Sequence, residues 1–149
     1  MPRGSLQASF LFFSDSFFTS TFCGRIYAVN RQEFMEKLER LDLPRSEFLI
    51  LSGGSLLLRG LRETTADMDI CVSEKLAAEL DLASCPRDKD GCYVPFEDVQ
   101  MKADMEGRAY DIIDGYRCQT LEDILERKRK WRRPKDLKDI AVIEEWLKR

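Results

Sequence analysis

The 149-residue chain has no histidine, and its five cysteines form no C-x-x-C pair. Without these groups the sequence contains no usual zinc-binding pattern. An odd number of cysteines is typical of reduced thiols in the cytoplasm. No stretch of apolar residues approaches the length needed to cross a membrane. We therefore expect a cytoplasmic protein that contacts no membrane.

Other features of the composition are typical of a globular domain. Apolar residues make up 44% of the chain, which is enough material for a core, and the length suggests one domain. The formal net charge of −3 argues against general coating of nucleic acid. Positive charge is nevertheless concentrated, because seven of the nine residues in 127–135 are lysine or arginine. This segment is a local basic patch that could meet phosphates.

The first 29 residues differ from the rest, because their phenylalanines are interleaved with serine and threonine and acids are nearly absent. Polar residues 14–16 interrupt the apolar run, so it lacks the unbroken centre of a secretory signal. Residues 2–5 (PRGS) resemble a protease-site scar from expression cloning. We expect residues 1–29 to be either such an artificial extension or an added element, and residues 30–149 to form a single domain.

Residues 30–149 alternate between helical and strand patterns. Asn30 and Glu33 have the spacing of a capping box, and an apolar stripe follows until Pro44. Further helices are expected over 55–61, after Ser73, after Thr120 and after Pro134, and strands over 48–51, 68–72, 99–103 and 110–113. The order predicts an α/β (α+β) fold, in which a small mixed β-sheet is flanked by helices and followed by a C-terminal helical pair.

Two short motifs have the chemistry of a metal-bound phosphate site. An apolar run that begins at Phe48 leads into Gly53-Gly54-Ser55, where backbone N–H groups can approach phosphates closely. A second run contains Asp67-Met68-Asp69, and strand alternation puts both carboxylates on one face. Two hard oxygen ligands so placed suit Mg²⁺. Phosphoryl transfer needs little more than positioning, charge neutralisation and a metal, so it requires no histidine.

In order, spacing and residue type, Gly54-Ser55 followed by Asp67-Met68-Asp69 resembles the signature of the DNA polymerase beta-like nucleotidyltransferase superfamily. Within it, Arg62-x-x-Thr65-x-Asp67-x-Asp69 and residues 128–139 (KRKWRRPKDLKD) look most like the small nucleotidyltransferases of abortive-infection and type IV toxin-antitoxin systems. The resemblance covers most of residues 48–147. It implies transfer of a nucleoside monophosphate from an NTP to an acceptor hydroxyl, with Mg²⁺ or Mn²⁺ as cofactor and pyrophosphate as product.

The resemblance also assigns roles to residues. Asp67 and Asp69 would be catalytic and would hold the metal. The nucleotide would be bound by Gly53, Gly54, Ser55, Arg62, Thr65 and Lys128. For Lys128 the alternative is an exposed lysine on a basic helix. The family pattern also suggests that Asp136 and Asp139 orient Lys128 or Arg133 across the break at Pro134.

The acceptor stays open at this stage. The resemblance permits RNA or tRNA 3′ ends, a protein side chain or a small molecule, and the basic segment 127–135 favours RNA. So short a chain has little room for a separate acceptor-binding domain. We therefore expect a partner, which would be an antitoxin or a second copy of the chain, unless the substrate is very small.

The family pattern is incomplete at the third carboxylate. The neighbouring strand offers Val99-Gln100-Met101 in the expected context, and an amide cannot replace an anionic metal ligand. Asp98 and Asp104 share the expected strand face of Gln100; Asp98 is the preferred third catalytic carboxylate, and the alternative is that both are solvated. Two other functions stay open: a non-catalytic nucleotide-binding or regulatory module, and an interaction domain whose basic helix binds nucleic acid or an acidic partner.

Overall fold

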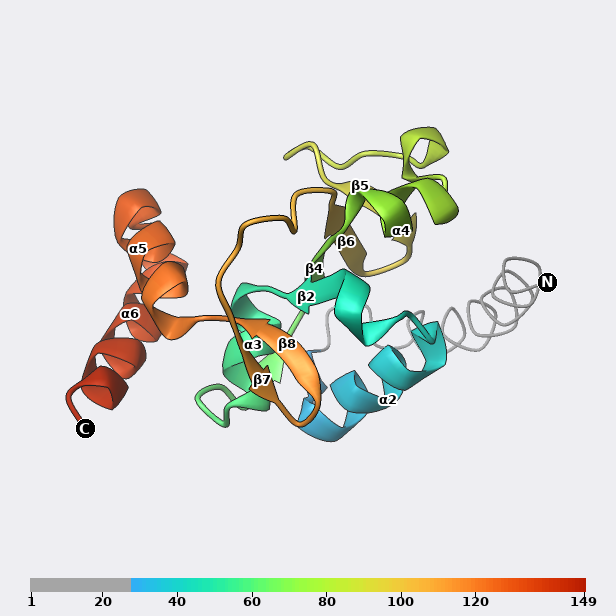
Figure 1. The fold of residues 1–149 in the computed structure, drawn as a ribbon. Helices are drawn as coiled ribbons and strands as arrows, with labels where there is room; N and C mark the ends of the chain where they lie inside the picture. The colour runs from blue at the N-terminus through green and yellow to red at the C-terminus, as the bar shows by residue number, and fades with distance from the viewer. Residues whose placement is uncertain (1–27) are drawn as a thin grey trace.

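The computed structural model describes residues 28–149 of the chain. At the centre of this part is a six-stranded mixed sheet (Figure 1). The strands lie side by side in the order β5-β6-β4-β2-β8-β7. Their bounds are Phe48–Ile50 (β2), Met68–Val72 (β4), Tyr93–Phe96 (β5), Val99–Lys102 (β6), Tyr110–Ile113 (β7) and Tyr116–Gln119 (β8). A separate two-stranded pair joins β1 (Val29–Asn30) to β3 (Thr64–Thr65).

Helices flank the sheet and complete the α+β fold that the sequence predicts. They are α2 (Arg31–Leu41), α3 (Ser52–Leu58), α4 (Glu74–Glu79), α5 (Leu121–Trp131) and α6 (Pro134–Leu147), with short 3-10 turns at η1 (Arg45–Glu47) and η2 (Leu82–Ser84). Among residues 28–149, none of the helices has both the length and the apolar character needed to span a bilayer. The expectations for residues 1–27 lie outside the described part of the chain.

Strand pairing places the carboxylate strand near the centre of the sheet. β4 runs antiparallel to β2 and parallel to β6, and β2 runs parallel to β8. The parallel register puts Asp69 of β4 beside Gln100 of β6. The amide of Gln100 therefore occupies the neighbouring-strand position at which the family pattern would place an acid.

The sheet has one apolar face and one partly polar face. Met68 and Ile70 of β4 enter the main core, where they pack with Phe34 of α2 and other buried side chains. On the opposite face, Leu49, Leu51 and Cys71 form a smaller cluster against Met105. Because side chains alternate along a strand, Asp69 lies on this second face, as the sequence predicts.

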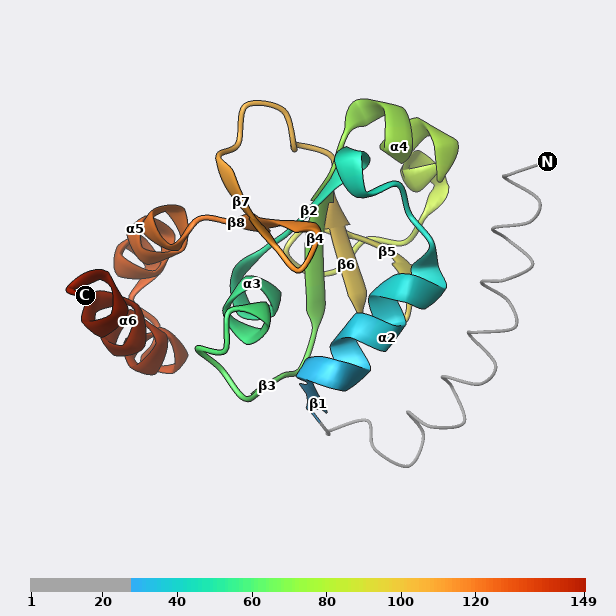
Figure 2. The ribbon, with the colours of Figure 1, turned by 60° about the horizontal axis from the view of Figure 1, so that its bottom comes forward.

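The predicted C-terminal helical pair is present and has a core of its own. Residues Leu121, Ile124, Leu125, Ile140 and Ile143 of α5 and α6 pack with Leu56 of α3. The break between the helices is at Arg132, which is left-handed (φ 45°), and at Pro134, which opens α6. Figure 2 shows the pair lying beside α3, on the other side of the molecule from α4.

Several local features differ from the expectations. Strands β1, β3, β5 and β8 were not predicted. For β8, Asp114 and Gly115 both have positive φ (52° and 84°) and form the turn that joins β7 to β8. Helix α3 begins at Ser52, three residues earlier than expected. Gly53, Gly54 and Ser55 therefore belong to the first turns of a helix and not to an open loop.

Candidate functional site

A cleft of about 1430 Å³ opens on the partly polar face of the sheet. Strands β4 and β6 supply Asp69, Gln100 and Lys102 to its lining, and the start of α3 supplies Ser52 and Gly53. The C-terminal helices close another side with Lys128, Asp136 and Asp139 among others. Elements far apart in sequence thus meet around the predicted carboxylates.

The two predicted metal ligands lie together in this cleft. Asp67 is exposed immediately before β4, and Asp69 is half-buried within the strand. Burial raises the pKa of Asp69 to about 6, and the neighbouring charge of Asp67 adds to the rise. Lys102 partly offsets both effects. Asp67 and Asp69 therefore concentrate negative charge in one part of the cleft, which a bound cation would relieve.

The donor set fits Mg²⁺ better than a metal that needs a complete protein cage. Within residues 28–149, no group of three or more carboxylates or thiols converges to hold an ion. Mg²⁺ commonly takes one or two carboxylates and completes its octahedron with substrate phosphates and water. Asp67 and Asp69 would fit a Mg²⁺ ion whose other ligands come from substrate and water.

Gly53 lies beneath two of the predicted nucleotide-binding side chains. A Cβ atom on Gly53 would lie 2.7 Å from Oγ1 of Thr65 and would overlap the guanidinium of Arg62. The Thr65 hydroxyl donates a long hydrogen bond to the Asp67 carbonyl oxygen (3.4 Å). Gly53, Arg62, Thr65 and Asp67 therefore form one continuous part of the cleft wall, as the sequence predicts.

Gly54 and Ser55 correct the prediction of direct phosphate contacts. The Ser55 side chain is fully buried; its hydroxyl donates to the Gln119 carbonyl oxygen (2.8 Å) and accepts from Arg59 Nε (3.2 Å). The Gly54 N–H donates to the Leu51 carbonyl oxygen (3.2 Å). Both residues are engaged inside the fold because α3 begins at Ser52, so Ser52 and Gly53 line the cleft in their place.

Glycine at position 54 is required by packing. A Cβ atom there would lie 2.6 Å from Cζ of Phe34 and 2.7 Å from Cγ2 of Ile50. We expect Gly54→Ala to lower the free energy of unfolding by about 1–3 kcal/mol, measured by urea denaturation, because both neighbours are buried in the core. Gly53→Ala should cost less stability, since its Cβ would overlap most with the guanidinium of Arg62, a long and partly exposed side chain that can move. A Gly54→Ala variant of full stability that had lost nucleotide affinity would contradict this packing role.

Lys128 is the centre of a buried ionic network. Its side chain is almost fully buried, and its Nζ lies 3.1 Å from Asp136 Oδ1 and 3.2 Å from Asp139 Oδ2. Arg62 Nη2 reaches Asp139 Oδ2 at 2.8 Å. The alternative of an exposed lysine is therefore wrong. The prediction that Asp136 and Asp139 orient Lys128 is confirmed, whereas contact between Lys128 and a nucleotide stays a prediction.

Asp136 fixes the junction of the two C-terminal helices. Its carboxylate accepts hydrogen bonds from the backbone N–H of Arg133 (3.2 Å) and from Arg133 Nε (2.8 Å) in addition to Lys128. Burial alone would raise the pKa of Asp136, but the hydrogen bonds from Arg133 and Lys128 outweigh it and lower the pKa to about 2. The network therefore contains three cations and two carboxylates, which leaves one net positive charge in the cleft wall.

Neither candidate for a third carboxylate, Asp98 or Asp104, lines the cleft. β6 begins at Val99, so Asp98 belongs to the turn after β5, has a φ of 63° and lies outside the cleft lining. Its charge acts on Lys37 of α2. Asp104 follows the end of β6 and pairs with Arg108 (2.8 Å). The cleft presents the amide of Gln100 beside Asp69.

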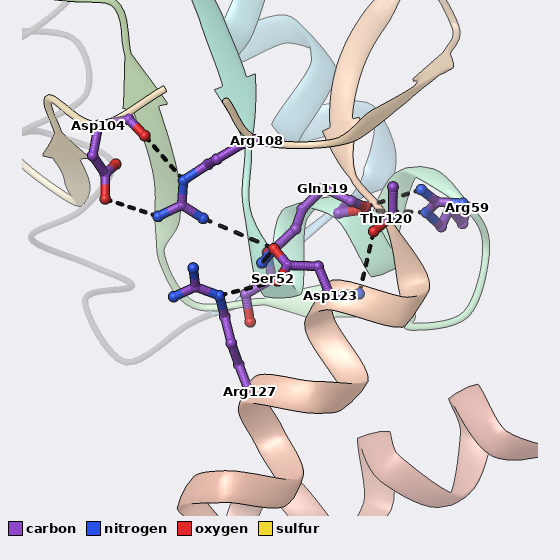
Figure 3. Close-up of polar contacts among 9 residues, drawn as sticks. Ser52, Arg59, Asp104, Arg108, Gln119, Thr120, Asp123 and Arg127 are labelled. Carbon is purple, nitrogen blue, oxygen red and sulfur yellow. Dashed lines mark hydrogen bonds and ion pairs between the residues drawn. The ribbon is translucent and has the colours of Figure 1, made fainter. Parts of the chain in front are cut away.

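Figure 3 shows a second polar network, which the sequence did not predict. Buried Gln119, at the end of β8, accepts a hydrogen bond from the backbone N–H of Ser52 (2.8 Å) and donates to Asp123 Oδ2 (2.6 Å). Arg108 Nη1 lies 3.9 Å from the same carboxylate oxygen of Asp123. These contacts join the β6–β7 loop, the start of α3 and the first turn of α5. The only local signal was the Thr120 cap, which predicted a helix start near Asp123 and is confirmed.

No protein-family model, curated protein or solved structure matches the chain. The functional argument therefore rests on the arrangement of residues in the cleft.

Proposed function

We propose that the protein is a metal-dependent nucleotidyltransferase, which moves a nucleoside monophosphate from an NTP to an acceptor hydroxyl. One observation carries the proposal: the Asp67 and Asp69 carboxylates line the same cleft as Arg62 and the Lys128 network. Phosphoryl transfer requires anionic ligands for a metal and cationic groups around phosphates. Neither the two carboxylates nor the cationic groups alone would indicate this reaction.

In the proposed reaction, the acceptor oxygen forms a bond to the α-phosphorus of the NTP. The bond from that phosphorus to the β-phosphate oxygen breaks, pyrophosphate leaves, and the hydroxyl proton passes to water. Bound Mg²⁺ or Mn²⁺ would neutralise charge and polarise the phosphoryl group. Asp67 and Asp69 would hold the metal. Arg62, fixed by Asp139 above Gly53, would face the phosphates.

RNA is the acceptor that we favour. Four cations of the segment 127–135 line the cleft, namely Arg127, Lys128, Arg133 and Lys135. Basic side chains beside a catalytic centre attract a phosphate backbone. We place the proposed reaction in the cytoplasm, where NTPs are available and the cysteine thiols would remain reduced.

The test is incubation of the purified chain with Mg²⁺ or Mn²⁺, total RNA and each NTP in turn, labelled at the α-phosphate. Label that becomes covalently attached to RNA would support the proposal and identify the base. Label on a protein or small-molecule acceptor added in place of RNA would support the reaction and change the acceptor. Metal-dependent NTP binding without transfer to any acceptor would overturn the enzymatic proposal.

A nucleotide-binding module without turnover is the second candidate, and Gln100 is the observation that favours it. Gln100 pairs in register with Asp69, so the two-carboxylate site has an amide where a third anionic ligand would assist the metal. In this reading, the cleft would bind an NTP and signal its presence to a partner.

Gln100→Asp would restore a third carboxylate beside Asp69. Without metal, we expect the thermal midpoint to fall by roughly 3 °C, because the new charge adds to the repulsion around Asp69. Saturating Mg²⁺ should reverse the loss, because the ion binds only the folded site. Thermal unfolding with EDTA and with Mg²⁺ would measure both effects, with Gln100→Asn as the neutral control. Equal responses of the two variants to Mg²⁺ would contradict a metal at Asp69.

A further inference from the structure

Three cationic side chains form a second wall of the cleft, separate from the Arg62–Lys128 network. They are Lys102 at the end of β6, Arg108 in the β6–β7 loop and Arg127 on α5. Figure 3 shows the guanidinium groups of Arg108 and Arg127 extending toward the same space beside Ser52 and Asp123. Lys102 lies two residues beyond Gln100 on the strand face of Asp69.

Lys102 and Arg108 are neighbours. Lys102 pairs in register with Cys71, and the charges of both cations act on the Cys71 thiol, whose pKa burial raises to about 11. Met105 of the same loop packs against the cluster that contains Cys71. The β6–β7 loop therefore holds Arg108 close to Cys71 of β4, the residue that pairs with Lys102.

The cations of the second wall are only partly engaged by direct contacts. The ammonium group of Lys102 makes no hydrogen bond or ion pair within residues 28–149, although its charge acts on Asp69. Arg127 has a side chain that is 41% exposed and one long contact to Asp123 (3.4 Å). Arg108 is bound by Asp104, through its side-chain oxygen (2.8 Å) and its carbonyl oxygen (3.1 Å).

Asp123 binds neither guanidinium fully, because its oxygens are shared among three partners. One oxygen accepts from Gln119 Nε2 (2.6 Å) and lies 3.9 Å from Arg108, and the other meets Arg127. Arg108 and Arg127 thus share one carboxylate that also binds Gln119, while the charge of Lys102 acts on Asp69 without an ion pair. An anion that entered between Arg108 and Arg127 would be attracted by both guanidinium groups.

We propose that Lys102, Arg108 and Arg127 form a second phosphate-binding subsite of the cleft. The phosphate belongs either to the distal part of the bound NTP or to the backbone of the acceptor strand. Guanidinium forks match the oxygens of a phosphate, and Arg108 is already held in place by Asp104, so little side-chain entropy is lost on binding. This inference deepens the proposed function and rests on it.

The test measures equilibrium binding by the wild-type chain and by Lys102→Gln and Arg127→Gln. The probes are ATP and AMP with Mg²⁺, and a short single-stranded RNA without a triphosphate. We expect each substitution to weaken phosphate binding about tenfold, which corresponds to the loss of one charge-assisted hydrogen bond. Circular dichroism and thermal unfolding would establish that the variants are folded.

Arg129→Gln is the matched control. Arg129 lies two residues along α5, has a half-exposed side chain paired with Glu144, and lies outside the cleft. Arg129→Gln removes one positive charge from the same helix as Arg127→Gln. Because Arg129 lies outside the cleft, this variant should bind all three probes within twofold of wild type. If Arg127→Gln weakened binding of the probes no more than Arg129→Gln does, the effect would come from the general charge of the helix, and the proposed subsite would be overturned.

The probes distinguish the two sources of the phosphate. Weaker ATP binding with unchanged AMP and RNA binding would assign the distal phosphate of the nucleotide. Weaker RNA binding with unchanged ATP binding would assign the acceptor backbone. Unchanged binding of all probes by both variants would overturn the inference while leaving the proposed function intact. A wild-type chain that bound RNA through these residues, but no NTP, would instead overturn the proposed function.

Discussion

Replacing Asp69 by asparagine is expected to abolish nucleotide transfer while leaving the fold intact. The amide keeps the shape of the side chain but removes the negative charge that holds the metal. Substitution of residues that only hydrogen-bond to the ligands of a metal site typically lowers metal affinity or activity about 10–100-fold. Loss of a ligand itself should therefore lower the transfer rate at least about 100-fold. The change lies on the partly polar face of the sheet, opposite Met68 and Ile70, so the core is not disturbed.

The stability of the metal-free Asp69→Asn protein makes the prediction sharper. Burial and the charge of Asp67 raise the pKa of Asp69 to about 6, so at neutral pH the carboxylate is the main form but its ionisation lowers the stability of the folded state relative to the unfolded chain. A neutral amide should therefore leave the thermal midpoint in EDTA unchanged or raise it. Lost activity with retained stability is the signature of a residue that serves a ligand and not the core.

The Asp69 experiment compares initial rates of label transfer with thermal unfolding in EDTA. Asp67→Asn should behave similarly, because it removes the other ligand. Glu126→Gln removes a charge from an exposed position on α5 outside the cleft and should retain wild-type rates. Full transfer by Asp69→Asn would exclude Asp69 as a metal ligand, and loss of folding would show that its role is structural.

Local patterns predicted those parts of the site that lie within one element. Alternation along β4 placed Asp69 opposite the core, and the capping box at Asn30 and Glu33 is present in the structure. The break at Pro134 and the helical pair around it also follow from local chemistry, because proline has no N–H to donate and opens a helix readily. The expectation that Asp136 and Asp139 orient Lys128 or Arg133 came instead from the family resemblance.

Contacts between distant elements could not be read in this way. The start of α3 depends on Ser52, whose φ of 45° is unusual for serine and whose N–H is bound by Gln119, 67 residues later. That early start moves Ser55 into the interior. Asp98 failed as a prediction because the turn before β6 interrupts the alternation on which its placement depended.

Among the proposed substitutions, Asp136→Ala is expected to cause the largest decrease in the free energy of unfolding. The Asp136 side chain is fully buried, and its removal leaves Lys128 buried with one remaining carboxylate, Asp139. Removing one partner of a buried ion pair costs about 3–5 kcal/mol. It also removes the acceptor for the N–H of Arg133 at the start of α6. For a chain of this length, we expect the thermal midpoint to fall by roughly 10 °C.

The pH dependence of unfolding provides a second test of the same carboxylate. The folded protein lowers the pKa of Asp136 from 3.8 to about 2, so below pH 3.8 the unfolded chain binds this proton first. The stability that Asp136 contributes is therefore fully present above that range and is lost as the pH falls through about 2. Asp136→Ala should lack this part of the acid destabilisation. The stability curves of the two proteins should consequently converge as the pH falls.

A double-mutant cycle with Lys128→Met separates the ionic contribution from loss of packing. If the cost of Asp136→Ala comes from an uncompensated buried charge, the double variant should be more stable than the sum of the single losses predicts, by about 1 kcal/mol or more. Glu145→Ala on the exposed side of α6 removes only a weak surface pair with Lys148 and should change stability by less than about 0.5 kcal/mol. Strict additivity of the two buried substitutions would show that Lys128 and Asp136 are not coupled. The rigid position of Lys128 in the cleft would then depend on Asp139 and on the packing of α5 against α6.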